Sequence, residues 1–283
     1  MTVANGFKAE ASGAGSVVRR CFANVAAAIA ILFRPARINS RQSWLPAPQQ
    51  LAIAAAVVIA VFLIGMIFVD AAASNAAVRL PRWLISSFDW FTDFGKSGWF
   101  LWPLGILFLG LAALPRLSHV SQLVLAAVMV RVGFLFVAIG LPSLFAAVIK
   151  NMIGRARPGV SGVVNPYLFD PFHWAPAYAG LPSGHATTAF AVLAAFGVLW
   201  PRARTALLIY ALLIAASRII VTAHYPTDVA AGALVGIIGV LLVRRYFALR
   251  RLGFSVGPDG ALHQFPGPSL RRIKSVAREL LAQ

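Results

Sequence analysis

Long apolar segments, rather than alternating apolar and polar positions, dominate this chain. Six of them approach or exceed the roughly 17–20 residues that a helix needs to cross a bilayer. These segments are 51–69, 97–114, 121–149, 183–200, 205–222 and 227–243. They lack the period of two that marks a membrane barrel, and a chain in lipid must satisfy its own backbone hydrogen bonds, so helices are predicted. The sequence therefore predicts an all-α polytopic membrane protein with six transmembrane helices.

The composition supports this class of protein and excludes several others. Of the 283 residues, 60% are hydrophobic and 12% are charged, which is about half the usual charged share. This apolar content excludes a disordered chain. The single Cys21 excludes an intrachain disulfide framework and a Cys-based zinc site.

The charge balance is strongly basic, with 25 Lys and Arg against 8 Asp and Glu. In a soluble protein this would indicate a nucleic-acid partner, but the apolar segments favour contact with anionic lipid head groups and no nucleic acid. With the N-terminus placed inside, 17 of the 25 cations fall on inner segments, 7 fall on outer ones, and Arg131 lies within the third segment. This excess of positive charge on the inner side predicts that both termini are cytoplasmic.

Three parts are predicted: an N-terminal cytoplasmic or interfacial segment at 1–50, a six-span domain at 51–246 and a basic cytoplasmic tail at 247–283. At 17–33 a short apolar run is followed by Arg34 and Pro35 rather than by a small-residue cleavage site. An interfacial helix is therefore favoured there over a cleaved signal peptide. In the tail, 257–260 indicates a turn, and 269–281 spaces its apolar residues as a basic amphipathic helix does.

Polar residues gather in three clusters at the predicted outer ends of the third to sixth segments. They are Lys150, Arg155 and Arg157 after the third segment, Ser183, Gly184 and His185 at the start of the fourth, and Arg218, His224 and Asp228 around the fifth and sixth. Each cluster alone has an ordinary explanation, as interfacial anchors, a helix N-cap or a structural His–Asp pair. Because all three clusters fall on one side, where such residues are costly, they indicate a functional site.

These residue types suit phosphoryl transfer. Three cations, Lys150, Arg157 and Arg218, offset the charge of a phosphate, and the amides at the start of the fourth helix add donors. A histidine attacks phosphorus when a carboxylate holds its other nitrogen, and a second histidine can protonate the leaving oxygen. No carboxylate cluster suited to Mg²⁺ or Zn²⁺ is visible, so no metal and no cofactor are predicted, and the reaction is expected to pass through a phosphohistidine.

Three motifs then identify a family. Lys150-x6-Arg157-Pro158, Pro182-Ser183-Gly184-His185 and Ser217-Arg218-x5-His224-x3-Asp228 are similar to the three motifs of the type 2 phosphatidic acid phosphatase (PAP2) and vanadium haloperoxidase superfamily. The six-span layout resembles the bacterial lipid phosphatase branch. The resemblance implies a PAP2-like helical bundle in the bacterial inner membrane, with its active site facing the periplasm.

The resemblance also implies a role for each matching residue. Catalysis would fall to His224 as nucleophile, Asp228 as the group that orients it and His185 as general acid, and phosphate binding to Lys150, Arg157, Ser183, Gly184 and Arg218. Arg155 lies outside the motifs and is predicted to be a rim residue at best.

A site at the membrane face favours a lipid substrate. The candidates are undecaprenyl pyrophosphate, phosphatidylglycerophosphate, phosphatidic acid and the phosphates of lipid A. Aromatic residues at 83–94 and 167–178 form either an ordinary aromatic belt or a lid that guides lipid chains. Two alternatives to hydrolysis remain open: transfer of the phosphoryl group to another lipid, and a membrane protein that binds lipid without turnover.

Overall fold

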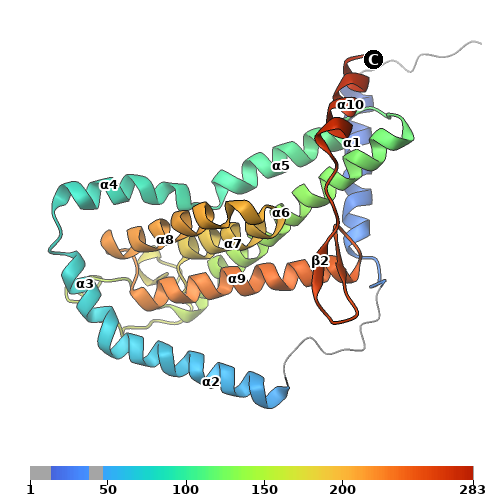
Figure 1. Ribbon diagram of the computed structural model, residues 1–283. Coiled ribbons are helices and arrows are strands. Elements are labelled where there is room, and N and C mark those ends of the chain that lie inside the picture. The colour runs from blue at the N-terminus through green and yellow to red at the C-terminus, as the bar shows by residue number, and fades with distance from the viewer. Residues whose placement is uncertain (1–13, 38–46, 283) are drawn as a thin grey trace, which may run out of the picture.

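The computed structural model describes residues 14–37 and 47–282 and is mostly helical (Figure 1). The helices are α1 Ala14–Leu32, α2 Pro48–Gly65, α3 Ala71–Ala77, α4 Arg82–Thr92, α5 Gly98–Ala113, α6 His119–Ile153, α7 Gly184–Leu199, α8 Arg204–Ile220, α9 Pro226–Leu249 and α10 Leu270–Leu281. Shorter helical turns are the π-helical η1 Met66–Asp70 and the 3₁₀ turns η2 Asp93–Gly95, η3 Pro176–Tyr178 and η4 Pro201–Ala203. Two strands, β1 Phe254–Val256 and β2 Leu262–Gln264, complete the fold. The all-α class is confirmed.

Six stretches of the described chain are long and apolar enough to cross a membrane. They are 15–32, 48–77, 82–113, 119–153, 201–220 and 226–249. This confirms a polytopic membrane protein, although the six differ from those predicted in two places. The stretch 15–32 is added, and α7, at 16 residues, is shorter than a spanning helix. α7 is short because Ser183 caps its start and the helix ends at Trp200, the residue before Pro201, where helices usually stop.

α1 lies across the ends of other helices. Asn24 Nδ2 donates to Ala112 O at 2.7 Å, at the end of α5. The Leu32 carbonyl accepts from Tyr246 Oη at 2.6 Å and from Arg250 Nε at 2.9 Å, at the end of α9. Both halves of α1 therefore contact the same end of the bundle, and α1 runs crosswise to α5 and α9 in Figure 1. An interfacial position of α1 stays a prediction that this arrangement supports.

α7 lies at the centre of the bundle, packed by α6, α8 and α9. α9 approaches α7 so closely that backbone atoms of α7 occupy the space where side chains of α9 would otherwise lie. A Cβ on Gly232 would lie 2.4 Å from Ser183 O, and one on Gly236 would lie 2.5 Å from Thr187 O. Buried apolar residues from α5, α6, α7 and α9 form the main core of the bundle. The core thus fixes the start of α7 against the start of α9, where the predicted site residues lie.

The C-terminal tail folds against the opposite end of the bundle. β1 and β2 pair antiparallel around the turn predicted at 257–260, and α10 covers the helix predicted at 269–281, so both predictions are confirmed. α10 docks on α6: Val276 is buried there, and the Glu279 carboxylate accepts hydrogen bonds from the hydroxyls of Ser118 and Ser121. Arg131, half-buried in α6, donates to the carbonyl of Phe265 in the same tail at 2.8 Å.

Candidate functional site

The end of α6 returns the chain toward the bundle through one tight turn. Lys150 lies in the last turn of α6, and Gly154 ends the helix in the left-handed region with φ +66°. A Cβ at Gly154 would lie 1.7 Å from Asp170 O, so only glycine fits. This turn carries Arg155 inward to a fully buried position and places Arg157 near the charges of Lys150 and Asp228.

The start of α7 forms the floor of the site. Ser183 is the N-cap, as predicted, with Oγ accepting from Ala186 N at 3.5 Å, and its own N–H donates to Asp228 O at 3.0 Å. No atom outside this helix turn lies within 4 Å of the place where a Cβ on Gly184 would be, so the space beside Gly184 is open. Helix N-termini attract anions through their free N–H groups and the helix dipole. His185 follows in this turn and lies against Gly95 of η2, where a Cβ would be 3.0 Å from His185 Cδ2.

A hydrogen bond to the last residue of α4 holds Arg218 in place. It lies in the last turn of α8, is 7% exposed, and donates from Nη1 to Thr92 Oγ1 at 2.7 Å. In the part of the chain that the structure describes, the buried Nε atoms of Arg218 and Arg157 have no hydrogen-bond partner. Unpaired buried donors are costly and rare in folded proteins. Two such donors on neighbouring guanidinium groups therefore indicate a place for an anion.

One ring nitrogen of His224 is held by a hydrogen bond, and, among the described residues, the other is free. Its side chain is 3% exposed, and Nδ1 lies 2.8 Å from Gly180 O but 3.7 Å from Asp228 Oδ2. A carbonyl can only accept, so Nδ1 donates to Gly180 and Nε2 carries the free lone pair. Gly180 is thus the nearer partner of Nδ1, because 3.7 Å is too long for the hydrogen bond expected from Asp228.

Burial lowers the pKa of the His224 imidazole below its ordinary value. The Asp228 carboxylate opposes this effect, and the cations Arg218 and Arg157 add to it. His224 lies between α8 and α9, where the backbone N–H of the same residue is held by Arg218 O at 3.1 Å. The site therefore favours a neutral imidazole with an available lone pair, which is the form that acts as a nucleophile.

The prediction that Arg155 is a rim residue is wrong. Its side chain is fully buried and bridges the Asp228 and Asp70 carboxylates at 2.6 and 2.7 Å. Sequence reasoning also missed Asp70, Thr92 and Gly180. A signal existed only for Asp70, a single carboxylate at the end of an apolar segment, because a charge in that place requires a partner.

In the described ranges, no group of three or more His, Cys, Asp or Glu side chains is arranged to hold a metal ion. The expectation of chemistry without metal or cofactor stays a prediction.

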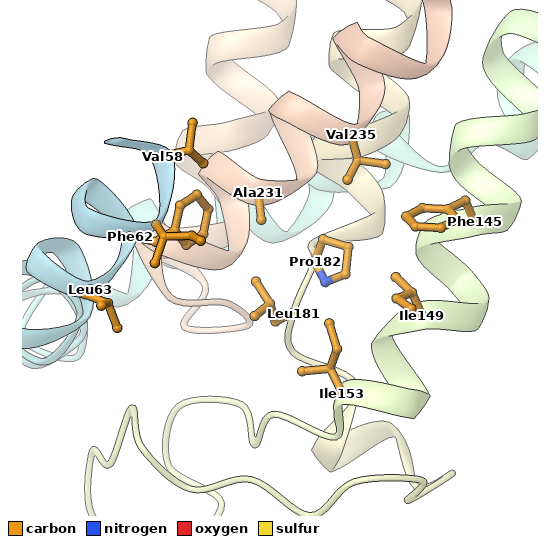
Figure 2. Close-up of a pocket in the computed structure, with 11 residues that line it drawn as sticks. Val58, Phe62, Leu63, Phe145, Ile149, Ile153, Leu181, Pro182, Ala231 and Val235 are labelled. Carbon is orange, nitrogen blue, oxygen red and sulfur yellow. The ribbon is translucent and has the colours of Figure 1, made fainter. Parts of the chain in front are cut away.

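A cavity of about 380 Å³ lies beside the start of α7 (Figure 2). Its lining is apolar and comes from α2, α6, α9 and the two residues before Ser183. Figure 2 shows Phe62 and Val58 on one side, Phe145 and Ile149 on the other, and Pro182 between them. Near the site, the side chains of the two aromatic segments are largely exposed, among them Trp83, Trp90, Phe172 and Trp174. Their function as a belt or a lid stays open.

Comparison with known proteins gives the family. The model of the PAP2 superfamily matches residues 131–252, which contain all three motifs. The lipid A 1-phosphatase of Rhizobium johnstonii is 37% identical over 171 residues, 60% of this chain and 70% of that protein. The lipid A 1-phosphatase of Rhizobium etli is 36% identical over 171 residues, 60% of this chain and 74% of that protein.

Two solved structures are also similar. The crystal structure of Aquifex aeolicus LpxE matches with a TM-score of 0.46 and 25% identity, covering 62% of this chain and 95% of that one. The first transmembrane PAP2 type phosphatidylglycerolphosphate phosphatase from Bacillus subtilis matches with a TM-score of 0.45 and 22% identity, covering 68% and 94%. On the family match and the curated relatives together, the chain belongs to the PAP2 superfamily.

Proposed function

We propose that this chain hydrolyses the phosphate of a membrane lipid at the extracytoplasmic face, without metal, through a phosphohistidine. The family and the two lipid A 1-phosphatase relatives support a phosphatase that acts on a lipid phosphate. One observation carries the chemistry: Arg157 and Arg218, whose buried Nε atoms have no hydrogen-bond partner among the described residues, lie near a histidine that burial keeps neutral.

The phosphate would bind between the cations and the start of α7. Lys150, Arg157 and Arg218 would balance the charge of the phosphate, while Ser183 and Gly184 offer the open N-terminal turn of the helix. These groups are fixed before the substrate arrives, so they stabilise the charge on the phosphoryl oxygens without reorganisation during the reaction.

The reaction would then proceed in two steps. The Nε2 lone pair of His224 attacks phosphorus, the bond from phosphorus to the lipid oxygen breaks, and His185 donates a proton to that oxygen. In the second step His185 takes a proton from water, the water oxygen attacks phosphorus, and the phosphorus–nitrogen bond breaks to release phosphate. His224 and His185 return to their starting states, so each turnover consumes one water molecule.

A lipid substrate fits the surroundings of this site. Pro182, the residue before Ser183, and Ile149, the residue before Lys150, both line the apolar cavity. A phosphate held by these polar neighbours would leave an attached acyl chain next to apolar walls. Among the four candidate lipids, the lipid A class should be tested first, because the names of the two curated relatives include it.

The direct test is phosphate release by the purified protein from the four lipid classes. We expect phosphate from at least one lipid, and a loss of about 10³-fold or more in His224→Ala, because no nucleophile remains. His263→Ala is the matched control, since His263 is exposed on the C-terminal hairpin. EDTA should leave the rate unchanged. A new phospholipid without free phosphate would indicate transfer, and an unchanged rate in His224→Ala would exclude this mechanism.

We also propose a location in the bacterial inner membrane, with the site facing the periplasm and both termini in the cytoplasm. The basic tail at 247–283 would then contact anionic lipid head groups. A topology reporter fused after Arg251 should give a cytoplasmic signal, and a periplasmic signal would contradict this orientation.

A further inference from the structure

Arg155 lies between two buried carboxylates outside the phosphate-binding set. Its Nη1 donates to Asp228 Oδ1 at 2.6 Å, and its Nη2 donates to Asp70 Oδ2 at 2.7 Å. The remaining donors reach Pro166 O, from Nε at 3.1 Å and Nη2 at 2.9 Å, and Thr227 Oγ1, from Nη1 at 2.7 Å. All five N–H groups of this guanidinium are thus used. Such an arginine has no donor left for a substrate.

Thr227 joins the same network from the start of α9. Its backbone N–H donates to Asp70 Oδ1 at 3.0 Å, and its hydroxyl donates to Asp70 Oδ2 while accepting from Arg155. Asp70 ends η1, a π-helical turn between α2 and α3. π-Helical turns in α-helices are rare and are frequent at functional sites. The network therefore ties the end of η1 to the first turn of α9.

Arg155 is linked to His224 in two ways, each through hydrogen bonds to an intermediate residue. Its side chain holds Asp228, whose Oδ2 accepts from Tyr225 N at 2.9 Å, the residue after His224. Its backbone carbonyl accepts from Gly180 N at 2.9 Å, and the Gly180 carbonyl accepts from His224 Nδ1. A Cβ on Gly180 would lie 2.7 Å from Arg155 O, so this contact is as close as backbone allows.

The network also sets the charge beside the nucleophile. Two carboxylates and one guanidinium leave one net negative charge, which favours the positive imidazole ring formed when nitrogen bonds to phosphorus. The groups that face His224 from the packed elements are Asp228 of α9, Arg218 of α8, Arg157 after α6 and His185 of α7. Asp70 of η1 acts at longer range through Arg155.

We propose that Arg155 and Asp70 are positioning residues of this site, which hold Asp228 and the Gly180 carbonyl at the nucleophile His224. This inference rests on the proposed function for its chemistry. Neither residue touches the phosphate. A buried ion pair contributes little net stability compared with apolar packing, so its place here is better explained by the geometry that it imposes on the site.

The test compares Asp70→Asn and Arg155→Lys with two matched controls. Asp259→Asn makes the same change on the exposed C-terminal hairpin, and Arg202→Lys makes it at the exposed turn η4. The measurements are kcat and KM for lipid phosphate release, the affinity for orthovanadate, and the thermal midpoint in detergent. Orthovanadate serves as an analogue of the phosphoryl-transfer transition state, so its affinity depends on the placement of His224 as well as on the phosphate contacts. We expect kcat to fall by about 10- to 100-fold in both test variants, as is typical when a residue that orients a reacting group is changed. KM should change by less than about threefold, because the phosphate contacts remain.

The pH profile separates positioning from loss of folded protein. Asp70→Asn removes one negative charge, so the pKa of His224 should fall and the acid limb of kcat/KM should move to lower pH. The double variant Asp70→Asn, Arg155→Met restores the net charge of the network, so the limb should return toward its original place. Its kcat should stay low, because Asp228 Oδ1 then loses the Arg155 guanidinium and only the Tyr225 N–H, among the described residues, still holds this carboxylate. A smaller folded fraction would lower the rate and leave the limb unmoved.

The outcomes are distinct. If Asp70→Asn and Arg155→Lys keep kcat and orthovanadate affinity within about twofold of the unmodified protein, the inference is overturned. If the unmodified protein releases no phosphate from any lipid, while orthovanadate affinity falls in the two test variants alone, the proposed function fails and the positioning inference stands. Should both variants fail to fold, Thr227→Val replaces them. It removes the hydroxyl between Asp70 and Arg155 without removing a charge, and a kcat within twofold of the unmodified protein would again overturn the inference.

Discussion

Three arginines near the site separate into two kinds. Arg157 and Arg218 each bury an Nε without a hydrogen-bond partner, among the residues that the structure describes. Arg155, two positions from Arg157, uses every donor on two carboxylates, a carbonyl and a hydroxyl. Side chains of equal charge thus differ in whether their hydrogen-bond donors are paired within the protein. Unpaired donors are available to a substrate that binds and dissociates, whereas paired donors hold the protein structure itself in place.

Removing an unsatisfied arginine should harm catalysis most. Arg218→Met is expected to lower kcat/KM by about 10³-fold, or about 4 kcal/mol, because one group that stabilises the phosphoryl charge is lost. Unfolding stability should fall by only about 1 kcal/mol, since the variant breaks the hydrogen bond to Thr92 but also removes an unpaired buried donor along with the charge. The measurement is phosphate release together with the thermal midpoint. A large fall in the midpoint with little change in rate would reverse the assignment of Arg218.

Removing the satisfied arginine should harm stability most. Arg155→Met leaves the Asp70 and Asp228 carboxylates buried without their cation, and breaking a buried pair in this way costs about 3–5 kcal/mol. The unfolding free energy in detergent measures this loss. Arg202→Met, at an exposed position, is the control. A stability within about 1 kcal/mol of the unmodified protein would mean that the network does not hold this part of the fold.

The pH dependence should show a smaller effect. A nucleophile acts in its deprotonated form, so on the acid side activity is lost as pH falls through the pKa of His224 in the folded protein. Because burial lowers that pKa, the acid limb of kcat/KM should lie below the ordinary histidine value of about 6.5. The profile is measured alongside the titration of the lipid phosphate by phosphorus NMR. An enzyme limb at or above the ordinary value would mean that His224 is not the group that titrates.

The segments with strong apolar character were predictable from sequence. Five of the predicted spans overlap spanning stretches of the structure, since length and hydropathy decide these elements locally. α7 is shorter than predicted because its ends depend on a cap and on Pro201 rather than on apolar character. α1 is apolar enough to be counted as a span, and only its contacts with α5 and α9 indicate a crosswise position.

The site was predictable where its residues follow local spacing. The three motifs place cations and histidines at helix ends, and the structure brings them to one end of the bundle. The pair of Arg155 and Asp70 was not predictable, because the two residues lie 85 positions apart and no periodicity links them. The Gly180 carbonyl was missed for a different reason: every residue has a carbonyl, so only the fold selects which one faces His224.

The six positions between Lys150 and Arg157 are more than a spacer of fixed length. At Gly154 the Asp170 carbonyl occupies the volume of any side chain, and the backbone has the sign of φ that other residues avoid. A library that keeps every motif letter and randomises the intervening letters would therefore lose most of its members at this single codon. For protein engineering, the first motif is better written with its glycine included.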